Sequence, residues 1–432
     1  MPAASRDVSP GVSDQPSAPA SRRLPAAVLI LGGAVFALGT SEFMLSGLLP
    51  EVADDLGVSI PTAGLLISAF AIGMVIGAPL LAAATQRLPR RTTLITLLAV
   101  FAACHVAGAL APSYGVLFAT RVVSALACAG FWAVGAAVAV SLVHPSARAR
   151  AMAVMIGGLS VANIAGVPGG AVLGQGFGWR AAFWAVALLT VAGLAGVVLF
   201  VPRVAPAPAG ERPRLRQEAR IYGDPHTLAA AGTIVLFAAG TFCFFSYLAP
   251  LLTDVSRLAE GWVPVVLVLY GVGTLTGTVL GGRLADRHPF GTLYAGLGAA
   301  TVVLVLIALL ARSAVATVAL AGLLGFAAFL ASPGLNARIF TVAGAAAPTL
   351  AAATATASFN AGNAVGPWAG GRVIDAGLGY AWTAWLGALF VLGALGTTAL
   401  QYRQASRSRC VAAHPGGARE RDAAPGAPAR RS

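Results

Sequence analysis

The chain has 432 residues, of which 58% are hydrophobic and 10% charged, and its mean hydropathy is +0.82. This apolar content predicts an integral membrane protein rather than a water-soluble one. All 28 basic residues are arginines, so a Walker A loop, which needs a lysine, is excluded, and with it transport driven by the chain's own ATP hydrolysis. The net charge of +13 does not indicate nucleic-acid binding, because the arginines fall in short loops and tails between apolar segments.

Twelve apolar segments follow one another, each near the roughly 20 residues that cross about 30 Å of hydrocarbon. The first is too long for the core of a signal peptide and is therefore kept as a span. The sequence predicts an all-α integral membrane protein with twelve transmembrane helices. The expected spans are 26–49, 61–86, 92–111, 114–142, 149–174, 180–201, 227–252, 262–284, 292–311, 314–340, 349–374 and 380–401.

Charge in the loops predicts the orientation. Loops after odd-numbered spans hold few arginines, whereas loops after even-numbered spans and both tails hold clusters of them. Because arginine-rich loops stay in the cytoplasm, both termini are expected there, with the chain in the plasma membrane. Composition predicts disordered tails over 1–25 and 403–432, and a cytoplasmic linker over 202–226 that joins six-helix bundles at 26–201 and 227–402.

The two bundles repeat one another about 200 residues apart. The matched residues include Gly39 with Gly240, Phe43 with Phe244, Pro50 with Pro250, Arg87 with Arg287, Asn163 with Asn363, Gly166 with Gly366, and Gly178 with Gly379. A duplicated module that keeps its direction, with an even number of spans per copy, is typical of a transporter built from parallel repeats.

One acidic residue, Glu42, lies inside the first span. A carboxylate there costs several kcal/mol when ionised and unpaired, so it is expected to face the bundle interior and to be protonated or paired in part of a cycle. Arg121 in the fourth span lies at nearly the same depth. The two are expected either to couple transport to protons or to form a purely structural ion pair.

A central cavity between the bundles is expected to have an apolar lining with few hydrogen-bonding groups, which suits a neutral amphipathic ligand. For each candidate residue, ordinary packing is the alternative. The candidates are Phe43, Trp132, Asn163, Phe245, Tyr247, Asn360 and Asn363. The four cysteines and five histidines show no metal-type spacing, so neither a metal nor a cofactor is expected. His105, inside a span, is interpreted as a packing residue, with a part in a proton path as the alternative.

Span 5 contains Gly158, Gly166, Pro168 and Gly170. This glycine spacing favours a face in close backbone contact, and the proline is expected to bend the helix. Two matching loops, after spans 2 and 8, hold charged residues that can bind helix C-terminal carbonyls, pair with opposite charges or only fix the topology. These residues are Arg87, Arg90, Arg91, Asp286 and Arg287.

Four segments resemble the major facilitator superfamily, specifically its twelve-span drug:proton antiporters and, among these, the chloramphenicol-export proteins of high-GC bacteria. They read GTSEFMLSGLLPEVADDLGVS, IPTAGLLISAF, TRVVSALACAGFWAV and GVPGGAVLGQGFGWRAAFWAV. The resemblance covers roughly residues 25 to 400. It implies proton transfer for Arg121, the antiporter motif for the span-5 residues Gly158 to Gly170, and cytoplasmic gating for Arg87 to Arg91.

The chain departs from the family pattern in two places. The gating loop has Gln86 and Ala82 where the family has Asp and Gly, although the second copy keeps Gly282 and Asp286. The antiporter motif reads Gly-Val-Pro-Gly-Gly instead of the commoner Gly-Pro form, so its bend is expected to be shifted by about one residue.

The expected function is proton-coupled export of a small neutral drug, chloramphenicol above all, by a monomer that alternates its access through rocking of the two bundles. The expected partners are the drug, protons and the lipid bilayer. A sugar or metabolite exporter of the same superfamily is the main alternative. A membrane enzyme would need a catalytic constellation, which the sequence does not show, and a sensor would show no proton-coupled flux.

Overall fold

The computed structural model describes residues 24–85, 88–203, 223–343 and 348–413, and these are helical throughout with no strand. The first half contains α1 (Ala26–Phe43), α2 (Leu49–Asp55), α3 (Ile60–Thr85), α4 (Arg90–Ala109), α5 (Tyr114–Ser141), α6 (Arg148–Val161), α7 (Val167–Phe177) and α8 (Trp179–Phe200). The second contains α10 (Pro225–Phe245), α11 (Leu248–Pro250), α12 (Val263–Arg287), α13 (Pro289–Leu310), α14 (Ala314–Ala343), α15 (Pro348–Asp375) and α16 (Ala381–Ala413).

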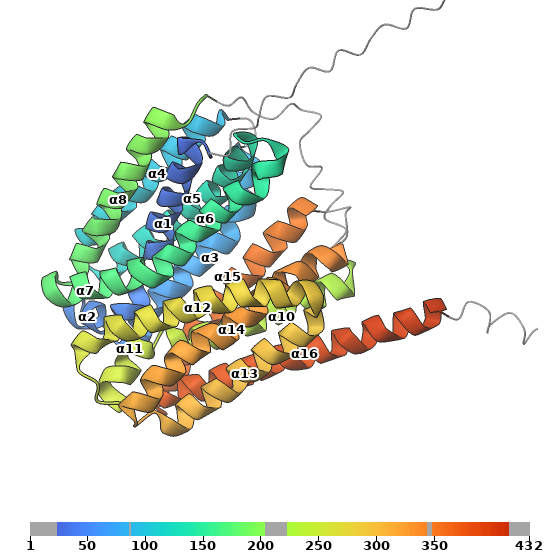
Figure 1. Ribbon diagram of the computed structural model, residues 1–432. Coiled ribbons are helices and arrows are strands. Elements are labelled where there is room, and N and C mark those ends of the chain that lie inside the picture. Colours follow the sequence, from blue (N-terminus) through green and yellow to red (C-terminus); the bar gives the residue numbers. More distant parts are fainter. Residues whose placement is uncertain (1–23, 86–87, 204–222, 344–347, 414–432) are drawn as a thin grey trace, which may run out of the picture.

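The helices form two bundles, each with its own hydrophobic core (Figure 1). We call the side where α1 and α10 begin and α8 ends the linker end, and the opposite side the far end. Near the far end the cores interlock, because Tyr247 packs into the first core and Phe43 into the second. Residues 204–222, the centre of the expected linker, and the tails 1–23 and 414–432 lie outside the described residues.

Eleven helical stretches of the described chain are long and apolar enough to cross a membrane. The remaining long helix, α15, is rich in threonine and asparagine and packs between α10 and α3 of the other half. Several of its polar side chains are buried there, including Thr354, Ser358, Asn360 and Asn363. Its place between the bundles explains the low hydropathy, since much of its surface faces protein rather than lipid. With α15, the fold has twelve spanning helices in two halves.

The first span of each half breaks near the far end. In the first half, α1 ends at Phe43 and a 3₁₀ segment, Met44–Gly47, leads into α2. In the second half, α10 ends at Phe245 and a turn leads into α11. Pro50 and Pro250 lie in the short helices that follow. The spans expected at 26–49 and 227–252 are therefore each interrupted near this end and are not continuous helices.

Span 5 does not simply bend at Pro168. A π-helical segment, Ala162–Gly166, separates α6 from α7, with Pro168 in the first turn of α7. A π-helical turn carries an extra residue in the hydrogen-bond ladder and is frequent at functional sites. The distortion therefore begins before the proline, at Ala162.

Two further features lie at the helix ends. Gly178 and Gly379 both have positive φ, at +80° and +84°, in the matching turns before the last span of each half. Arg91 donates to the carbonyl of Val198 in the last turn of α8, which confirms that this arginine binds a helix C-terminal carbonyl.

The disordered C-terminal tail was expected to begin at residue 403, but the last helix extends beyond that point. Helix α16 continues past Arg403 to Ala413, because the segment 403–413 contains neither glycine nor proline and is rich in good helix formers such as arginine, alanine and glutamine. His414, Pro415 and Gly416 follow where the helix ends.

At the far end, the loop after α2 is tied to the start of α8. Asp55 forms an ion pair with Arg180, and its carboxylate also accepts a hydrogen bond from the Trp179 indole. The hydrogen bond from Arg180, followed by that from Trp179, holds the pKa of Asp55 below its usual value. Asp55 therefore stays ionised near neutral pH. Because both side chains are solvent-accessible, the pair contributes little stability and mainly orients the loop.

Candidate functional site

An aromatic layer joins the two halves. Phe43 of α1 stacks on Phe242 of α10, with ring centroids 5.5 Å apart. Phe242 makes edge contacts with Phe245 at 5.9 Å and with Phe359 of α15 at 5.7 Å. Phe245 in turn stacks on Tyr270 of α12 at 4.4 Å. These five rings, which we call the aromatic layer, come from four helices and both halves.

Buried polar atoms with unmet hydrogen-bonding capacity accompany the layer. The Tyr270 hydroxyl and the side-chain oxygens of Asn360 and Asn363 have no hydrogen-bond partner among the described residues, and each residue is only 3% exposed. The Asn360 amide nitrogen donates to the Thr356 carbonyl, which leaves its oxygen as the free acceptor. A buried polar group without a partner costs about 1–3 kcal/mol, so a ligand that supplies hydrogen-bond donors would recover that energy here.

Exposure shows on which side the layer is accessible. Leu29, Phe36 and Phe43 are spaced by seven residues and so share one face of α1. Leu29 is 56% exposed and Phe36 partly exposed, whereas Phe43 is 6% exposed. On α15, Thr356 is exposed while Asn363, seven residues further on, is buried. The facing sides of the halves are therefore open toward the linker end and closed at the aromatic layer.

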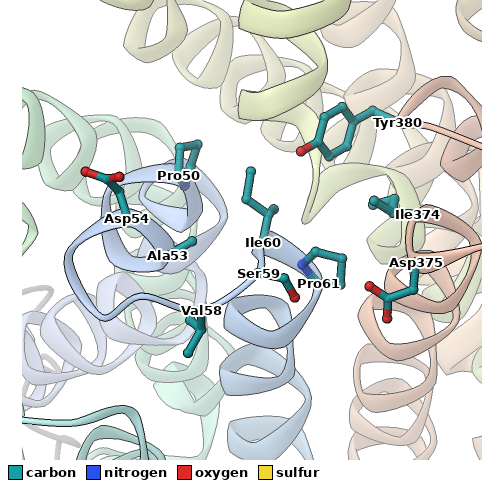
Figure 2. Close-up of a pocket in the computed structure, with 10 residues that line it drawn as sticks. All are labelled: Pro50, Ala53, Asp54, Val58, Ser59, Ile60, Pro61, Ile374, Asp375 and Tyr380. Carbon is teal, nitrogen blue, oxygen red and sulfur yellow. The ribbon is translucent and has the colours of Figure 1, made fainter. Parts of the chain in front are cut away.

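The far end is closed by direct contacts between the halves. Ser68 of α3 donates to the Ala364 carbonyl of α15 at 2.7 Å, and Gln175 donates to the Glu260 carbonyl at 2.8 Å. A pocket of about 590 Å³ remains on this seam, lined from the first half by 50–61 and from the second by Ile374, Asp375 and Tyr380. In Figure 2, Asp375 and Tyr380 extend toward Ile60 and Pro61, whereas Asp54 points away.

The seven residues expected to line a cavity occupy different places in the structure. Phe43 and Phe245 belong to the aromatic layer, and Asn360 and Asn363 are buried on α15 within four residues after Phe359, which also belongs to it. Tyr247 lies elsewhere: it is fully buried against Gly64 and Gly371, and its hydroxyl donates to the Pro367 carbonyl at 2.7 Å, so it closes the far end.

The other two expected cavity residues, Asn163 and Trp132, do not belong to the aromatic layer. A Cβ added to Gly271 of α12 would lie 2.6 Å from the Asn163 backbone oxygen, so Asn163 marks a contact between the halves. The Asn163 amide donates to the Leu159 carbonyl of its own helix at 3.2 Å. Trp132 is partly exposed and packs on the first core, with no ring contact to the aromatic layer.

Glu42 and Arg121 are both buried but are not paired directly. Arg121 is 1% exposed and donates through Nη1 to the Ser41 hydroxyl at 2.7 Å and through Nη2 to the Ser41 carbonyl at 2.9 Å. Its guanidinium also lies over the Phe70 ring, 4.3 Å from the centroid. Within the described chain, the one ion pair is Asp55 with Arg180. The contact with Ser41 confirms that Arg121 lies at the depth of Glu42.

Glu42 faces the interior of the first half. Successive residues of an α-helix point about 100° apart, so Glu42 lies on a different side of α1 from both Ser41 and Phe43. Glu42 is 8% exposed and makes no hydrogen bond to a described residue, and its carboxyl lies close enough to Arg121 and Cys128 of α5 to interact electrostatically with both. It is a buried acid beside, and not within, the aromatic layer.

The span-5 glycines lie against α1. A Cβ added to Gly158 would lie 2.2 Å from the Gly32 carbonyl oxygen, and one added to Gly166 would lie 2.0 Å from the Thr40 hydroxyl. One added to Gly170 would meet Met44 at 3.3 Å. The matching face of α15 behaves alike, because a Cβ on Gly366 would lie 2.6 Å from the Ala239 carbonyl of α10. Any residue larger than glycine would separate these helices.

The charged residues of the expected gating loops make few contacts that would show their role. Arg87 lies outside the described residues, and Arg90 is the first residue of α4. Asp286 and Arg287 are exposed in the last turn of α12, and neither forms an ion pair with another described residue. Their gating role stays a prediction.

Replacing Arg121 with lysine is expected to reduce transport at least tenfold while the protein still inserts. Lysine is a point charge that cannot make both hydrogen bonds to Ser41 in the geometry of the planar guanidinium, and each charge-assisted bond contributes about 1.5–3 kcal/mol. The initial rate of transport in vesicles, normalised to protein content, measures the effect. A wild-type rate in Arg121→Lys would leave this arginine without a role in transport.

Several functional candidates escaped sequence reasoning. Phe242, Tyr270 and Phe359 are ordinary apolar residues in the sequence, and only the approach of four helices brings them together. His105 was interpreted as packing, yet its ring bonds to Ser41 beside Arg121. The repeat offered one usable signal for Phe242: it occupies the position that matches Ser41, two residues before the matched pair Phe43 and Phe244.

Comparisons with known proteins agree with this architecture. The Major Facilitator Superfamily profile matches residues 31–352. A chloramphenicol resistance protein of Streptomyces lividans is 42% identical over 86% of this chain and 95% of its own length, and the inner membrane transport protein YdhP of Escherichia coli (strain K12) is 38% identical over 89% and 98%.

The fold also matches solved structures. A bacterial homologue of the human lysosomal transporter Spinster, in an inward-facing and unoccupied conformation, superposes with a TM-score of 0.72 at 18% identity, covering 89% of this chain and 98% of the other. Together with the two six-helix halves and the site between them, these matches show that the chain is a membrane transport protein that belongs to the Major Facilitator Superfamily.

Proposed function

We propose that this protein exports a small neutral amphipathic drug, chloramphenicol above all, in exchange for protons. The observation that carries the proposal is Glu42, a buried carboxyl inside a span that has no ion-pair partner among the described residues. An acid at this depth is costly when charged, so it is suited to binding a proton in one state and releasing it in another. We place the chain in the plasma membrane as a monomer, with the linker end in the cytoplasm.

The aromatic layer supports a neutral ligand with a ring and hydrogen-bond donors. Its rings offer stacking surfaces, and the free oxygens of Asn360 and Asn363 accept hydrogen bonds. Chloramphenicol carries a nitrophenyl ring, hydroxyl groups and an amide N–H, which matches both features. The name of the Streptomyces lividans relative supports the same substrate.

The two halves differ in a way that supports coupled exchange. At the offset of the repeat, Glu42 corresponds to Cys243 and Ser41 to Phe242. The first half therefore carries the titratable group, while the second contributes four of the five rings in the aromatic layer. Proton binding at Glu42 would act on α1, and the same helix presents Phe43 to the drug. The proton and the drug therefore both influence the position of α1.

Alternating access then proceeds by rocking of the halves. The arrangement seen here, open at the linker end and closed at the far end, receives drug from the cytoplasm. Opening the far end requires the contacts of Ser68 with Ala364 and of Gln175 with Glu260 to part. Exchange of a neutral drug for entering protons uses both the pH gradient and the membrane potential, the latter about 2.3 kcal/mol per charge per 100 mV.

Expression in a bacterial host that lacks its own drug pumps is expected to raise resistance to chloramphenicol. Labelled drug should accumulate less in energised cells and return to the control level when a protonophore collapses the gradient. Cells with empty vector provide the baseline, and a panel of sugars and other metabolites covers the alternative substrate class, whose hydroxyls could also satisfy the asparagines. Equal chloramphenicol accumulation with and without the protein in energised cells would overturn the drug assignment and leave the fold unaffected.

A further inference from the structure

A buried hydrogen-bond chain links three helices beside Glu42. The Ser41 hydroxyl of α1 lies 2.7 Å from Arg121 Nη1 of α5 and 2.7 Å from His105 Nε2 of α4. All three side chains are at most 1% exposed. One hydroxyl oxygen therefore connects the arginine to the histidine, in a region with no access for bulk water.

The direction of each hydrogen bond follows from its partners. His105 Nδ1 lies 2.8 Å from the Phe101 carbonyl, which can only accept, so Nδ1 carries the proton. In the neutral ring Nε2 is then an acceptor, and the Ser41 hydroxyl must donate to it. The lone pairs of that hydroxyl are left to accept from Arg121. His105 thus fixes the orientation of the Ser41 hydroxyl, so that its oxygen accepts the hydrogen bond from Arg121.

The ring of His105 is itself held firmly. It lies between Phe101 and Phe183, with centroids at 4.3 and 5.7 Å. The titratable groups near this chain are Glu42 of α1 and Arg121 and Cys128 of α5. The remaining neighbours of α1 bring none to this depth, because α3 has no ionisable residue and those of α6 and α8 lie at the helix ends.

We propose that His105 and Ser41 are positioning residues, which hold the Arg121 guanidinium on the Ser41 side of α1 and so leave the neighbouring Glu42 carboxyl free to exchange its proton. The proposal rests on the coupling role of Glu42 proposed above. Without the Ser41 hydroxyl or its acceptor, Arg121 loses a fixed partner and can turn toward Glu42, one residue along the same helix. A persistent ion pair would then favour the charged carboxylate and oppose its protonation.

The test is the pH profile of chloramphenicol transport by the full-length protein in vesicles. Ser41→Ala and His105→Ala are expected to move the half-maximal pH by about one unit or more toward acid, which is a tenfold change in proton concentration. The double variant should shift no further than either single one, because both changes break the same chain. Thr190→Val, which removes a buried hydroxyl that bonds only to its own helix at Val186, is the control.

Two substitutions of His105 separate positioning from packing. Glutamine places an acceptor near Nε2 and is expected to restore most of the wild-type profile, whereas the shorter asparagine can reach only the Phe101 carbonyl and should behave like alanine. Since neither residue titrates in this range, rescue by glutamine would also show that His105 acts through its hydrogen bond and not as a proton carrier.

Unshifted profiles in Ser41→Ala and His105→Ala, with rates lowered equally at every pH, would overturn the positioning role. Failure of glutamine to restore a shifted profile would overturn it as well. Glu42→Gln in the same vesicles tells the two proposals apart. If that variant keeps the wild-type pH dependence, the coupling role of Glu42 fails; if it loses the pH dependence while Ser41→Ala keeps it, only the positioning role fails.

Discussion

Replacing Glu42 with glutamine is expected to abolish efflux driven by the pH gradient, while the protein still inserts and folds. The amide retains the size of the side chain and removes only the titratable proton, and burial of a neutral group is less costly than burial of a charge. The measurement is accumulation of labelled chloramphenicol in energised vesicles. With Glu42→Gln, this accumulation should equal that in vesicles without the protein.

The matched control is Asp54→Asn, the same chemical change in an exposed residue 12 positions further along the chain, outside the first span. It should transport normally, because its carboxylate points away from the residues across the far-end seam (Figure 2). Undiminished gradient-driven efflux by Glu42→Gln would remove Glu42 from the coupling role and leave it as a structural residue.

The second large effect is expected at Gly166. Leucine there would place its Cβ 2.0 Å from the Thr40 hydroxyl and its remaining atoms between α1 and span 5. Such overpacking costs about 1–3 kcal/mol or more, and here it would also displace the helix that carries Glu42. We expect at least a tenfold loss of efflux rate with substantial protein remaining in the membrane.

Gly169→Leu is the matched control, because a Cβ added at Gly169 in the same span would meet no atom of another helix within 4 Å. Both variants add the same side chain to the same span, so membrane insertion should respond alike. If Gly166→Leu transports as well as Gly169→Leu, the glycines of span 5 are ordinary residues and their close contact with α1 has no part in transport.

Much of the architecture could be predicted from the sequence, because it depends on local composition. Apolar length predicted the spans, and even the polar α15 was expected as a span. The repeat predicted matching features that the structure confirms, such as the positive φ of Gly178 and Gly379. Details that depend on tertiary contacts could not be predicted, including the end of α1 at Phe43 and the π-helical segment before Pro168.

The candidate site was only partly predictable for the same reason. Glu42 and Arg121 could be found because charged residues inside spans are rare. Their mutual arrangement could not, since Arg121 reaches Ser41 only through the packing of α5 on α1. Likewise Phe43 and Phe245 were identifiable as aromatic residues in suitable spans, but Tyr270 is one apolar ring among many until α12 approaches α10.

The most direct test of proton-coupled export is whether drug movement itself moves protons. Purified protein would be placed in liposomes that contain chloramphenicol and a pH-sensitive dye, and then diluted into drug-free buffer with no imposed pH gradient. Drug leaving through the protein should draw protons inward and acidify the lumen, and the acidification should be absent with Glu42→Gln. Chloramphenicol release without acidification in the wild-type protein, or equal acidification by Glu42→Gln, would contradict the account.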